Sequence, residues 1–304
     1  MQPVSLRRIR EEYRRTLSVI HDGREADALF YWTAEEILRK ERRQLTECLD
    51  EPLDDTAARL FESVLSRLRQ GEPVQYVFGK AYFLDLELEV DPSVLIPRGE
   101  TEELALWAED TLRLVPRPVI LDLCTGSGAI AVALAKKRPE SEVFACDISL
   151  PALRTASRNN AKCGTDVRFF RQDILEEPLP GSVGNRSFDL VVSNPPYVRP
   201  SEKALMHDNV LRHEPHPALF VPEDDPLRFY RSVARIAMDV LRTGGCVMAE
   251  INEAFPGECK ALFEQTGFAD VSVREDLHGR PRMLRGFKIA SKNVSSRDYS
   301  AQER

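Results

Sequence analysis

The feature that most constrains the fold is an apolar segment, residues 119–123, that runs into a glycine-containing loop and then into a second aliphatic segment. The loop holds Gly126 and Gly128, and residues 129–135 are all Ala, Ile, Val or Leu. This order predicts a buried strand, a tight turn and a helix. Glycine allows unusual φ angles and a close approach of the backbone to a ligand. The free N–H groups of the helix N-terminus would point at that ligand.

Two further strand-like segments end next to acidic residues. Residues 143–146 are apolar and lead into Asp147, at a distance from the glycine loop that suits an acid binding the hydroxyls of a ribose. This pattern fits either a nicotinamide or an adenosyl cofactor. Residues 167–170 precede Asp173, which can accept from an adenine amino group or can serve as a turn or N-cap acid. The residues expected to bind the cofactor are Cys124, Thr125, Gly126, Ser127, Gly128, Asp147 and Asp173.

The sequence Asn194-Pro195-Pro196-Tyr197 closes another apolar segment, residues 188–193. Two prolines cannot continue a strand, so the chain must leave the sheet at the edge where open α/β sheets bind ligands. The Asn194 side chain and the Pro195 carbonyl can each accept an N–H, which matches the planar –NH2 group of an amide or a base. Tyr197 supplies a flat wall for that plane. An ordinary Pro-Pro strand exit is the alternative reading of these four residues.

These motifs, with three further stretches, resemble the protein-glutamine N5-methyltransferases that modify peptide chain release factors. The stretches are Gly-Glu-Pro-Val-Gln-Tyr-Val-Phe-Gly at 71–79, Leu-Ile-Pro-Arg-Gly-Glu-Thr-Glu at 95–102 and Glu-Pro-His-Pro-Ala-Leu at 214–219. Asn-Pro-Pro-Tyr also occurs in adenine-N6 methyltransferases of DNA, whereas the stretch at 95–102 is much more specific to the glutamine enzymes. The chain departs from the family at Cys124, where Gly is frequent, and at Gly99, where Pro is frequent.

The resemblance implies a Rossmann-like α/β sheet that uses S-adenosyl-L-methionine, preceded by a small helical domain. It implies Asn194, Pro195 and Tyr197 as catalytic residues, with Pro196 also at the substrate, and adds Asn194 and Thr101 to the cofactor contacts. Its target would be the glutamine of a Gly-Gly-Gln tripeptide in release factors. The expected units are a helical substrate-docking domain over 1–72, a β-hairpin linker over 73–92, a methyltransferase domain over 93–290 and a disordered tail over 291–304.

Local patterns give the expected elements. Apolar residues at helical spacing predict three helices, at about 6–20, 24–40 and 55–70. Partial alternation over residues 75–92 predicts a β-hairpin with its turn near Gly79, and Thr101 is a candidate helix cap. Residues 227–241 predict an amphipathic helix, and residues 246–251 a strand that ends in an acid. The last two strands, near 271–273 and 284–289, are expected to form an antiparallel edge.

Composition bounds the function. A chain of 304 residues suits two domains, and its net charge of −7 argues against a nucleic-acid binder with a broad basic surface. The six cysteines show no Cys-x-x-Cys pair and read as reduced thiols, which predicts a cytoplasmic protein. No His/Cys set has metal-ligand spacing, and no segment is long and apolar enough for a membrane span. We expect a monomer without metal.

The expected reaction is direct methyl transfer to an amide nitrogen held by two acceptors, with no strong general base. Three alternatives stay open on the residues alone. A ribosomal-protein glutamine methyltransferase would share the catalytic motifs and differ in its docking surfaces. A nucleic-acid adenine-N6 methyltransferase would use the same acceptor pair with a basic channel. A cofactor-binding protein without catalysis would be expected to carry a damaged Asn194 or Asp147, and both are intact.

Overall fold

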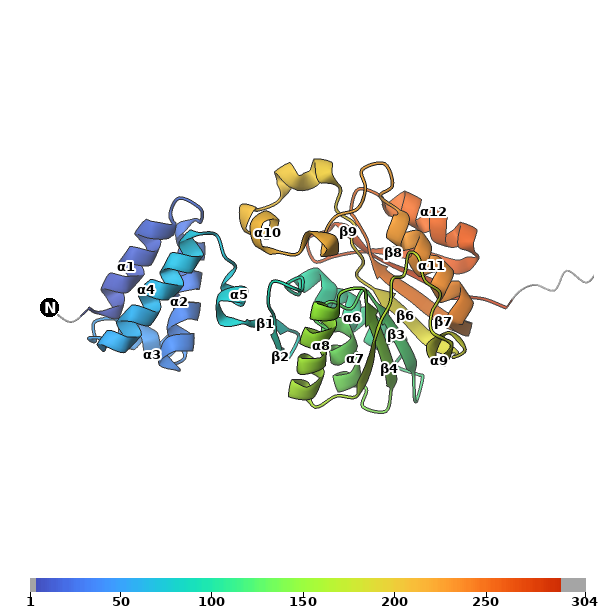
Figure 1. Ribbon diagram of the computed structural model, residues 1–304, viewed down its shortest axis with the longest axis horizontal. Coiled ribbons are helices and arrows are strands. Elements are labelled where there is room, and N and C mark those ends of the chain that lie inside the picture. The colour runs from blue at the N-terminus through green and yellow to red at the C-terminus, as the bar shows by residue number, and fades with distance from the viewer. Residues whose placement is uncertain (1–3, 291–304) are drawn as a thin grey trace, which may run out of the picture.

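The computed structural model describes residues 4–290 and begins with a bundle of four helices. Figure 1 shows this bundle at the N-terminal end, beside the larger domain. Tyr13, Phe30 and Phe61 meet edge-to-face or stacked at its centre, with centroids 5.8–6.3 Å apart. The bundle therefore has its own aromatic core. Its helices are α1 (Leu6–Leu17), α2 (Gly23–Leu38), α3 (Arg42–Glu47) and α4 (Asp55–Arg69).

The three helices expected in this region are confirmed, with shorter ends. Asp22 and Asp54 cap α2 and α4 by accepting backbone N–H groups, which explains why these helices start where they do. Ile20 lies beyond the end of α1 and is 47% exposed, so it is not part of the buried face. The short helix α3 was not expected, because its six residues show too few apolar repeats.

The linker differs from the expected hairpin. Residues Val74–Phe78 form a short helix, α5, and Gly79 ends it with φ +68°. The hairpin follows as β1 (Lys80–Phe83) and β2 (Leu86–Glu89), with Phe83 opposite Leu86. The expected turn near Gly79 is therefore wrong. The chain turns at Leu84 (φ +51°), whose N–H donates to the Glu102 carboxylate at 2.7 Å.

The larger domain contains a seven-stranded sheet with the order β5-β4-β3-β6-β7-β9-β8. The first five of its strands in chain order pair in parallel, and β9 pairs antiparallel with β7 and β8. The expected α/β fold with an antiparallel edge is thus confirmed. The strands are β3 (Val119–Leu123), β4 (Glu142–Asp147), β5 (Val167–Arg171), β6 (Phe188–Ser193), β7 (Leu241–Glu250), β8 (Phe268–Glu275) and β9 (Pro281–Lys288).

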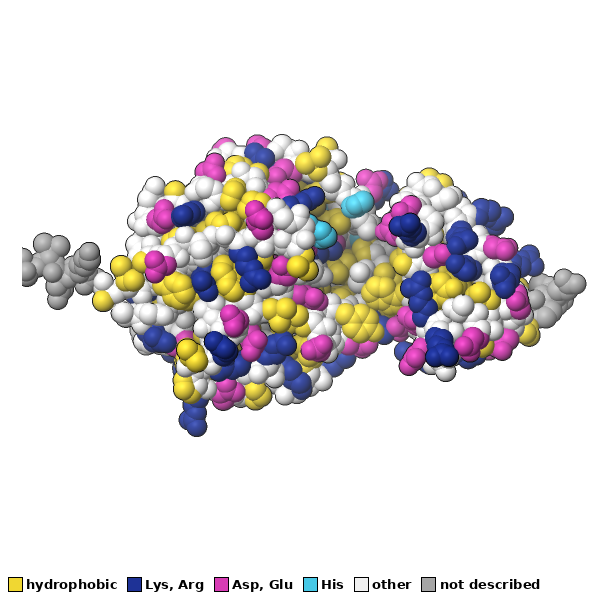
Figure 2. Space-filling view, turned by 180° about the vertical axis from the view of Figure 1, so that it is seen from behind, with side chains coloured by type: hydrophobic (Ala, Val, Ile, Leu, Met, Phe, Trp, Pro, Cys, Tyr) yellow, Lys and Arg dark blue, Asp and Glu magenta, His cyan; other side chains and the backbone are white. Residues whose placement is uncertain are grey.

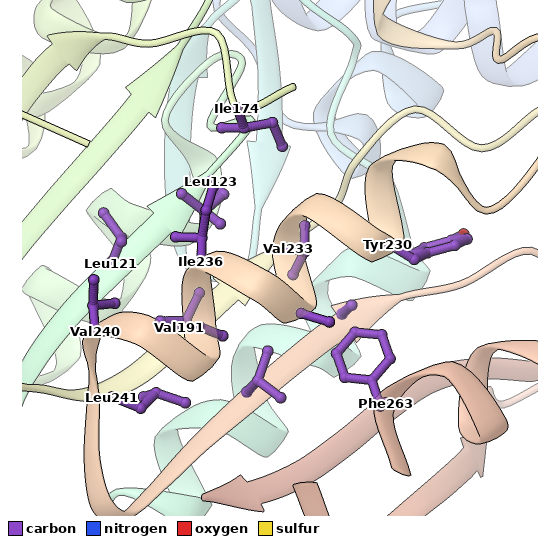
Figure 3. Close-up of a cluster of buried hydrophobic side chains, with 14 of the residues drawn as sticks. Leu121, Leu123, Ile174, Val191, Tyr230, Val233, Ile236, Val240, Leu241 and Phe263 are labelled. Atoms are coloured by element: carbon purple, nitrogen blue, oxygen red, sulfur yellow. The ribbon is translucent and has the colours of Figure 1, made fainter. Parts of the chain in front are cut away.

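Helices cover both faces of this sheet. One hydrophobic core joins the strands to α6 (Gly99–Thr111) and α7 (Ala129–Lys137), with α8 (Leu150–Cys163) beside α7. The core on the opposite face joins them to α11 (Arg228–Val240) and α12 (Pro256–Thr266) and contains Tyr230 and Phe263, as Figure 3 shows. Short elements complete the domain: α9 (Gly181–Gly184), η1 (Pro200–Leu205), α10 (Asp208–His213) and η2 (His216–Ala218).

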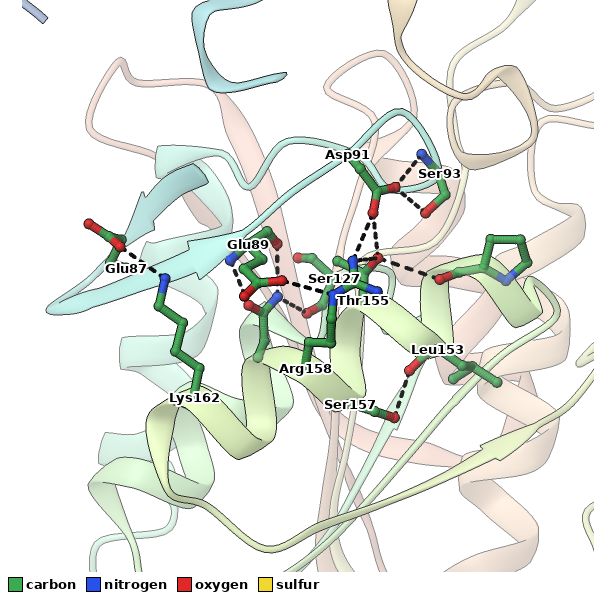
Figure 4. A network of polar contacts seen from close by, with 12 residues as sticks. Glu87, Glu89, Asp91, Ser93, Ser127, Leu153, Thr155, Ser157, Arg158 and Lys162 are labelled. Carbon is green, nitrogen blue, oxygen red and sulfur yellow. Dashed lines mark hydrogen bonds and ion pairs between the residues drawn. The ribbon is translucent and has the colours of Figure 1, made fainter. Parts of the chain in front are cut away.

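A polar network joins the hairpin to the larger domain (Figure 4). Arg158 of α8 bonds both Glu89 and Asp91, and Thr155 donates to Asp91 at 2.8 Å. The buried Asn159 side chain exchanges hydrogen bonds with the backbone of Glu89 and also donates to the Ser127 carbonyl at 2.9 Å. The hairpin is thus held against the glycine loop. Residues 291–304, expected to form a tail, lie outside the described residues.

Candidate active site

A cavity of about 340 Å³ opens at the carboxyl ends of the central parallel strands. From β3 the chain first builds β4 and β5 on one side and then returns to build β6 and β7 on the other. The cavity is lined by residues that follow β3, β4, β5 and β6. It therefore lies at the topological switch point, where open α/β sheets bind their ligands.

The glycine loop forms one wall of this cavity. The Asp147 carboxylate accepts the Gly126 N–H at 2.9 Å and the Ser149 N–H at 2.9 Å, so it ties the loop to the end of β4. Gly126 has φ +55°, and a Cβ placed there would meet nothing within 4 Å. Gly128 instead packs on Ala156, where a Cβ would come within 3.1 Å. Gly128 therefore serves helix packing and is not among the lining residues of the cavity.

The other expected cofactor residues gather around the same space. The lining includes Cys124, Thr125, Gly126, Ser127, Asp147, Asp173, Asn194 and Thr101. Asp173 accepts the Leu175 N–H at 2.9 Å and so also acts as a turn acid. Apolar side chains from several segments complete the walls, among them Ile148, Ile174, Leu175 and Phe229. A largely apolar slot with carboxylates at two strand ends suits a nucleoside.

A second cavity, also of about 340 Å³, lies on the other side of Asn194. Asn194 borders both cavities, whereas Pro195 and Tyr197 line only the second and Pro196 only the first. The four residues predicted around the reacting group thus stand between the two spaces. The second cavity is also lined by Met206, His207 and Leu219, from the segment that follows η1.

Asn194 is held by a buried polar chain that starts on β7. Its Nδ2 donates to Thr101 Oγ1 at 3.0 Å, and Thr101 donates to Glu250 Oε2 at 2.6 Å. The Tyr197 hydroxyl donates to Glu250 Oε1 at 2.9 Å. Thr101 was a candidate cap for α6, but it does not cap this helix. Arg98 is the N-cap, and the Thr101 hydroxyl turns inward to the buried carboxylate of Glu250.

Two segments that cover the cavities are joined by an ion pair. Arg98 Nη2 donates to Glu214 Oε1 at 2.5 Å, and the other oxygen of Glu214 accepts the Ile96 N–H at 3.2 Å. Glu214 is only 4% exposed. The pair connects residues 95–98 to the loop before η2, and both segments line the cofactor cavity.

Burial shifts the acids of the site upward. It raises the pKa of the fully buried Asp122, which accepts from Thr125, to about 7. Burial also raises the pKa of Asp147 and of Glu250. The pKa of the Cys124 thiol rises well above its usual value for the same reason, so this thiol stays protonated. Of these groups, Cys124 and Asp147 line the first cavity and Glu250 lines the second.

Comparison with known proteins decides the family. The PrmC N-terminal domain model matches residues 9–79, and the methyltransferase small domain model matches residues 110–214. The release factor glutamine methyltransferase of Flavobacterium psychrophilum is 38% identical over 284 residues, 92% of this chain and 98% of that protein. The protein of that name from Streptomyces coelicolor is 42% identical over 76% of this chain and 81% of its own. The chain belongs to the release factor glutamine methyltransferase family.

Solved structures of methyltransferases match this chain at low sequence identity. A Thermus thermophilus 16S rRNA N2 G1207 methyltransferase in complex with AdoMet and guanosine has a TM-score of 0.49 and 19% identity. The match covers 69% of this chain and 49% of that one. Within residues 4–290 no helix is long and apolar enough to cross a membrane. No three His, Cys, Asp or Glu side chains in that range group as a metal site.

The cofactor of this protein is S-adenosyl-L-methionine. The first cavity fits it: each Asp147 oxygen accepts one N–H and keeps capacity for a ribose hydroxyl. The open space beside Gly126 gives room for a ligand against the loop backbone. Glu250 was not assigned to the site from sequence, although it lines the second cavity. Glu250 was visible only as an acid after a buried strand, and that position was the available signal.

Proposed function

We propose that this enzyme transfers a methyl group from S-adenosyl-L-methionine to the side-chain amide nitrogen, N5, of the glutamine in the Gly-Gly-Gln motif of release factors. The observation that carries the proposal is the position of Asn194, on the border of both cavities. A methyl donor in the first cavity and an amide in the second would meet beside its side chain. Curated relatives of nearly the same length carry the name release factor glutamine methyltransferase.

In the first cavity, the two carboxylates have assigned partners on the cofactor. Asp147 accepts from the ribose hydroxyls, and Asp173 accepts from the adenine amino group. The loop residues from Cys124 to Ser127 and the start of α7 lie against the rest of the molecule. Thr101 contributes only its surface, because its single hydroxyl proton is already given to Glu250. Asn194 completes the wall on the side of the reacting methyl group.

The second cavity holds the acceptor amide. S-adenosyl-L-methionine supplies a methyl group activated by a positively charged sulfur. An amide nitrogen is a weak nucleophile because its lone pair is delocalised into the carbonyl. Asn194 Oδ1 and the Pro195 carbonyl each accept one N–H, which raises electron density on nitrogen and stabilises the positive charge that develops there. The ring of Tyr197 restrains the amide plane, and the proton leaves after transfer, when the nitrogen has become acidic.

The substrate is a folded protein, so a docking surface has to present the glutamine. The helical bundle with the PrmC N-terminal domain match is the docking unit. The enzyme works as a monomer in the cytoplasm, where translation ends. Nucleic acid is not needed for binding in this proposal.

The decisive experiment is methyl transfer from labelled S-adenosyl-L-methionine to purified release factor. A copy with the Gly-Gly-Gln glutamine changed to alanine is the matched control. We expect label on the first protein and none on the second. Label on neither, with cofactor binding confirmed by calorimetry, would overturn the proposed substrate. Ribosomal protein and DNA would then be offered to the same preparation, to separate the other two acceptor classes.

A further inference from the structure

Three side chains from three elements form one series of hydrogen bonds in the walls of the two cavities. Glu250 ends β7, Thr101 lies in the first turn of α6, and Asn194 follows β6. Ser193 pairs with Ala249 in the parallel ladder, so Asn194 and Glu250 follow paired positions on adjacent strands. Glu250 is 1% exposed and Thr101 5%. The hydrogen bond between Thr101 and Glu250 therefore lies in the protein interior.

While Glu250 is ionised, the donors and acceptors in this series of hydrogen bonds can be assigned in only one way. A carboxylate has no proton to give, so the single hydroxyl hydrogen of Thr101 points to Glu250. Toward Asn194 the hydroxyl offers a lone pair only. Asn194 must therefore turn its –NH2 group to Thr101, which leaves Oδ1 on the opposite side. No other side chain in residues 4–290 hydrogen-bonds the Asn194 amide.

We propose that Glu250, acting through Thr101, is a positioning residue that fixes the Asn194 amide with its oxygen toward the acceptor. The proposal rests on the proposed function and deepens it. The two ends of an asparagine amide have nearly the same shape, so packing alone selects weakly between them. A flipped Asn194 would present –NH2 to the –NH2 of the substrate and lose the acceptor that the reaction needs.

The fixed orientation of the Asn194 amide also determines which chemical group the second cavity can bind. With Oδ1 and the Pro195 carbonyl facing the cavity, a group must donate two N–H bonds to fit, and a carboxylate is repelled. Tyr197 holds the other oxygen of Glu250, which fixes the carboxylate plane. Its hydroxyl is thereby occupied, so Tyr197 meets the substrate with its ring. Glu250, which itself lines the second cavity, thus helps to distinguish a glutamine from a glutamate through the orientation of the Asn194 amide.

Protonation of Glu250 would allow the donor and acceptor roles in these hydrogen bonds to reverse. A neutral carboxyl can donate to Thr101, which can then donate its own hydrogen to Asn194 Oδ1. Burial raises the Glu250 pKa, the hydrogen bonds from Thr101 and Tyr197 and the charge of Arg282 oppose that rise, and the charge of Glu100 adds to it. We therefore expect kcat to fall on the acid side as Glu250 is protonated. Glu250→Gln cannot titrate, so its kcat should lack this acid limb, and an unchanged limb would contradict the proposal.

Thr101→Val and Thr101→Ser form the matched pair for the test. Valine keeps the shape and removes the hydroxyl, whereas serine keeps the hydroxyl. With wild-type enzyme already shown to label release factor, Thr101→Val should lower kcat about 10- to 100-fold, because a misplaced partner of the reacting group can cost about 100-fold. KM for release factor and the dissociation constant of S-adenosyl-L-methionine should change little, and Thr101→Ser should restore kcat. Wild-type kcat in Thr101→Val, or equal loss in both variants, would overturn the proposal.

A second measurement reads the amide itself and needs no substrate. In side-chain amide spectra of ¹⁵N-labelled enzyme, the Asn194 signals are identified by their loss in Asn194→Ala. We expect one Nδ2 proton to be shifted by its bond to Thr101 in wild type and in Thr101→Ser. That shift should disappear in Thr101→Val. A shift that persists there would overturn the assigned orientation, even if the proposed substrate proved wrong.

Discussion

At the scale of single residues, Asn194 concentrates the chemistry because it borders both cavities. Asn194→Ala should lower kcat about 100- to 1,000-fold, the effect of removing one fixed partner of the developing charge. Binding of S-adenosyl-L-methionine, measured by calorimetry, should stay near wild type. Asn185→Ala, on an exposed residue before β6, is the control and should keep full activity. Full activity in Asn194→Ala would rule out the acceptor pair.

Asp147 is expected to act on binding rather than turnover. Asp147→Ala removes the acceptor for the Gly126 N–H and, in the proposed complex, for the ribose. Hydrogen bonds to a charged group contribute about 1.5–3 kcal/mol, so the dissociation constant for S-adenosyl-L-methionine should rise at least about tenfold. The exposed Asp166→Ala is the matched control. Unchanged affinity in Asp147→Ala would remove the ribose assignment.

Asp122 makes a prediction about stability and pH. Its folded-state pKa of about 7 lies above the ordinary value of 3.8, so the folded form binds the proton more tightly than the unfolded form. The stability that this group contributes is fully present at low pH and is lost as the pH rises from 3.8 to about 7. Asp122→Asn keeps an acceptor for Thr125 and does not titrate. Its Tm advantage over wild type should therefore grow with pH across the window, and a constant difference would refute the buried titration.

Much of the site followed from where the strands end. Asp147, Asp173 and Asn194 were predicted because the carboxyl ends of parallel strands share one edge, and all three line one cavity. The bond between Thr101 and Glu250 could not be predicted, because it joins positions 149 residues apart. A threonine near a helix start reads locally as a cap. Only the tertiary fold brings a carboxylate within its reach.

At the scale of elements, the glycine loop carries a residue in a strained conformation. Cys124 has φ +60°, in the left-handed region that favours glycine. Cys124→Ala should keep this strain, and Cys124→Gly should relieve it. We expect the glycine variant to be the more stable of the two by about 1 kcal/mol, measured by denaturant unfolding. Equal stability, or a more stable alanine variant, would show that the loop relaxes around a side chain.

The parallel strands and their helices were predictable because each carries a long apolar run or a clear helical repeat. The linker was not, because residues 74–78 are too short for a helical repeat and their aromatic residues also suit a strand. Gly79 was correctly seen as a break. It ends a helix in the structure, however, and the hairpin turn follows at Leu84. The local sequence therefore indicated a break at Gly79 but did not show which secondary structure lies on either side of it.

At the scale of the whole molecule, one segment connects the bundle to the site. Figure 2 shows a hollow between the bundle and the larger domain, with hydrophobic side chains on its floor and histidine at its rim. His213 Nε2 lies 3.3 Å from the Gln70 carbonyl at the end of the bundle, and Glu214 beside it bonds Arg98. Lys80 of the hairpin bonds Glu36 of α2 at 2.5 Å. The bundle is thus tied to the segments that line both cavities.

Leu205 tests whether a protein substrate docks beside the acceptor cavity. It ends η1, is 87% exposed and immediately precedes Met206 and His207 of the cavity wall. Leu205→Glu should raise KM for whole release factor about 30-fold, because about 2 kcal/mol of apolar contact is lost. Methylation of a short Gly-Gly-Gln peptide should not change, since a peptide reaches only the cavity. Leu114→Glu is the control, because Leu114 is equally exposed, at 85%, but lies before β3 at the opposite edge of the sheet. If both variants gave the same KM for release factor, docking would have to involve another face, and the bundle surface would be scanned in the same way.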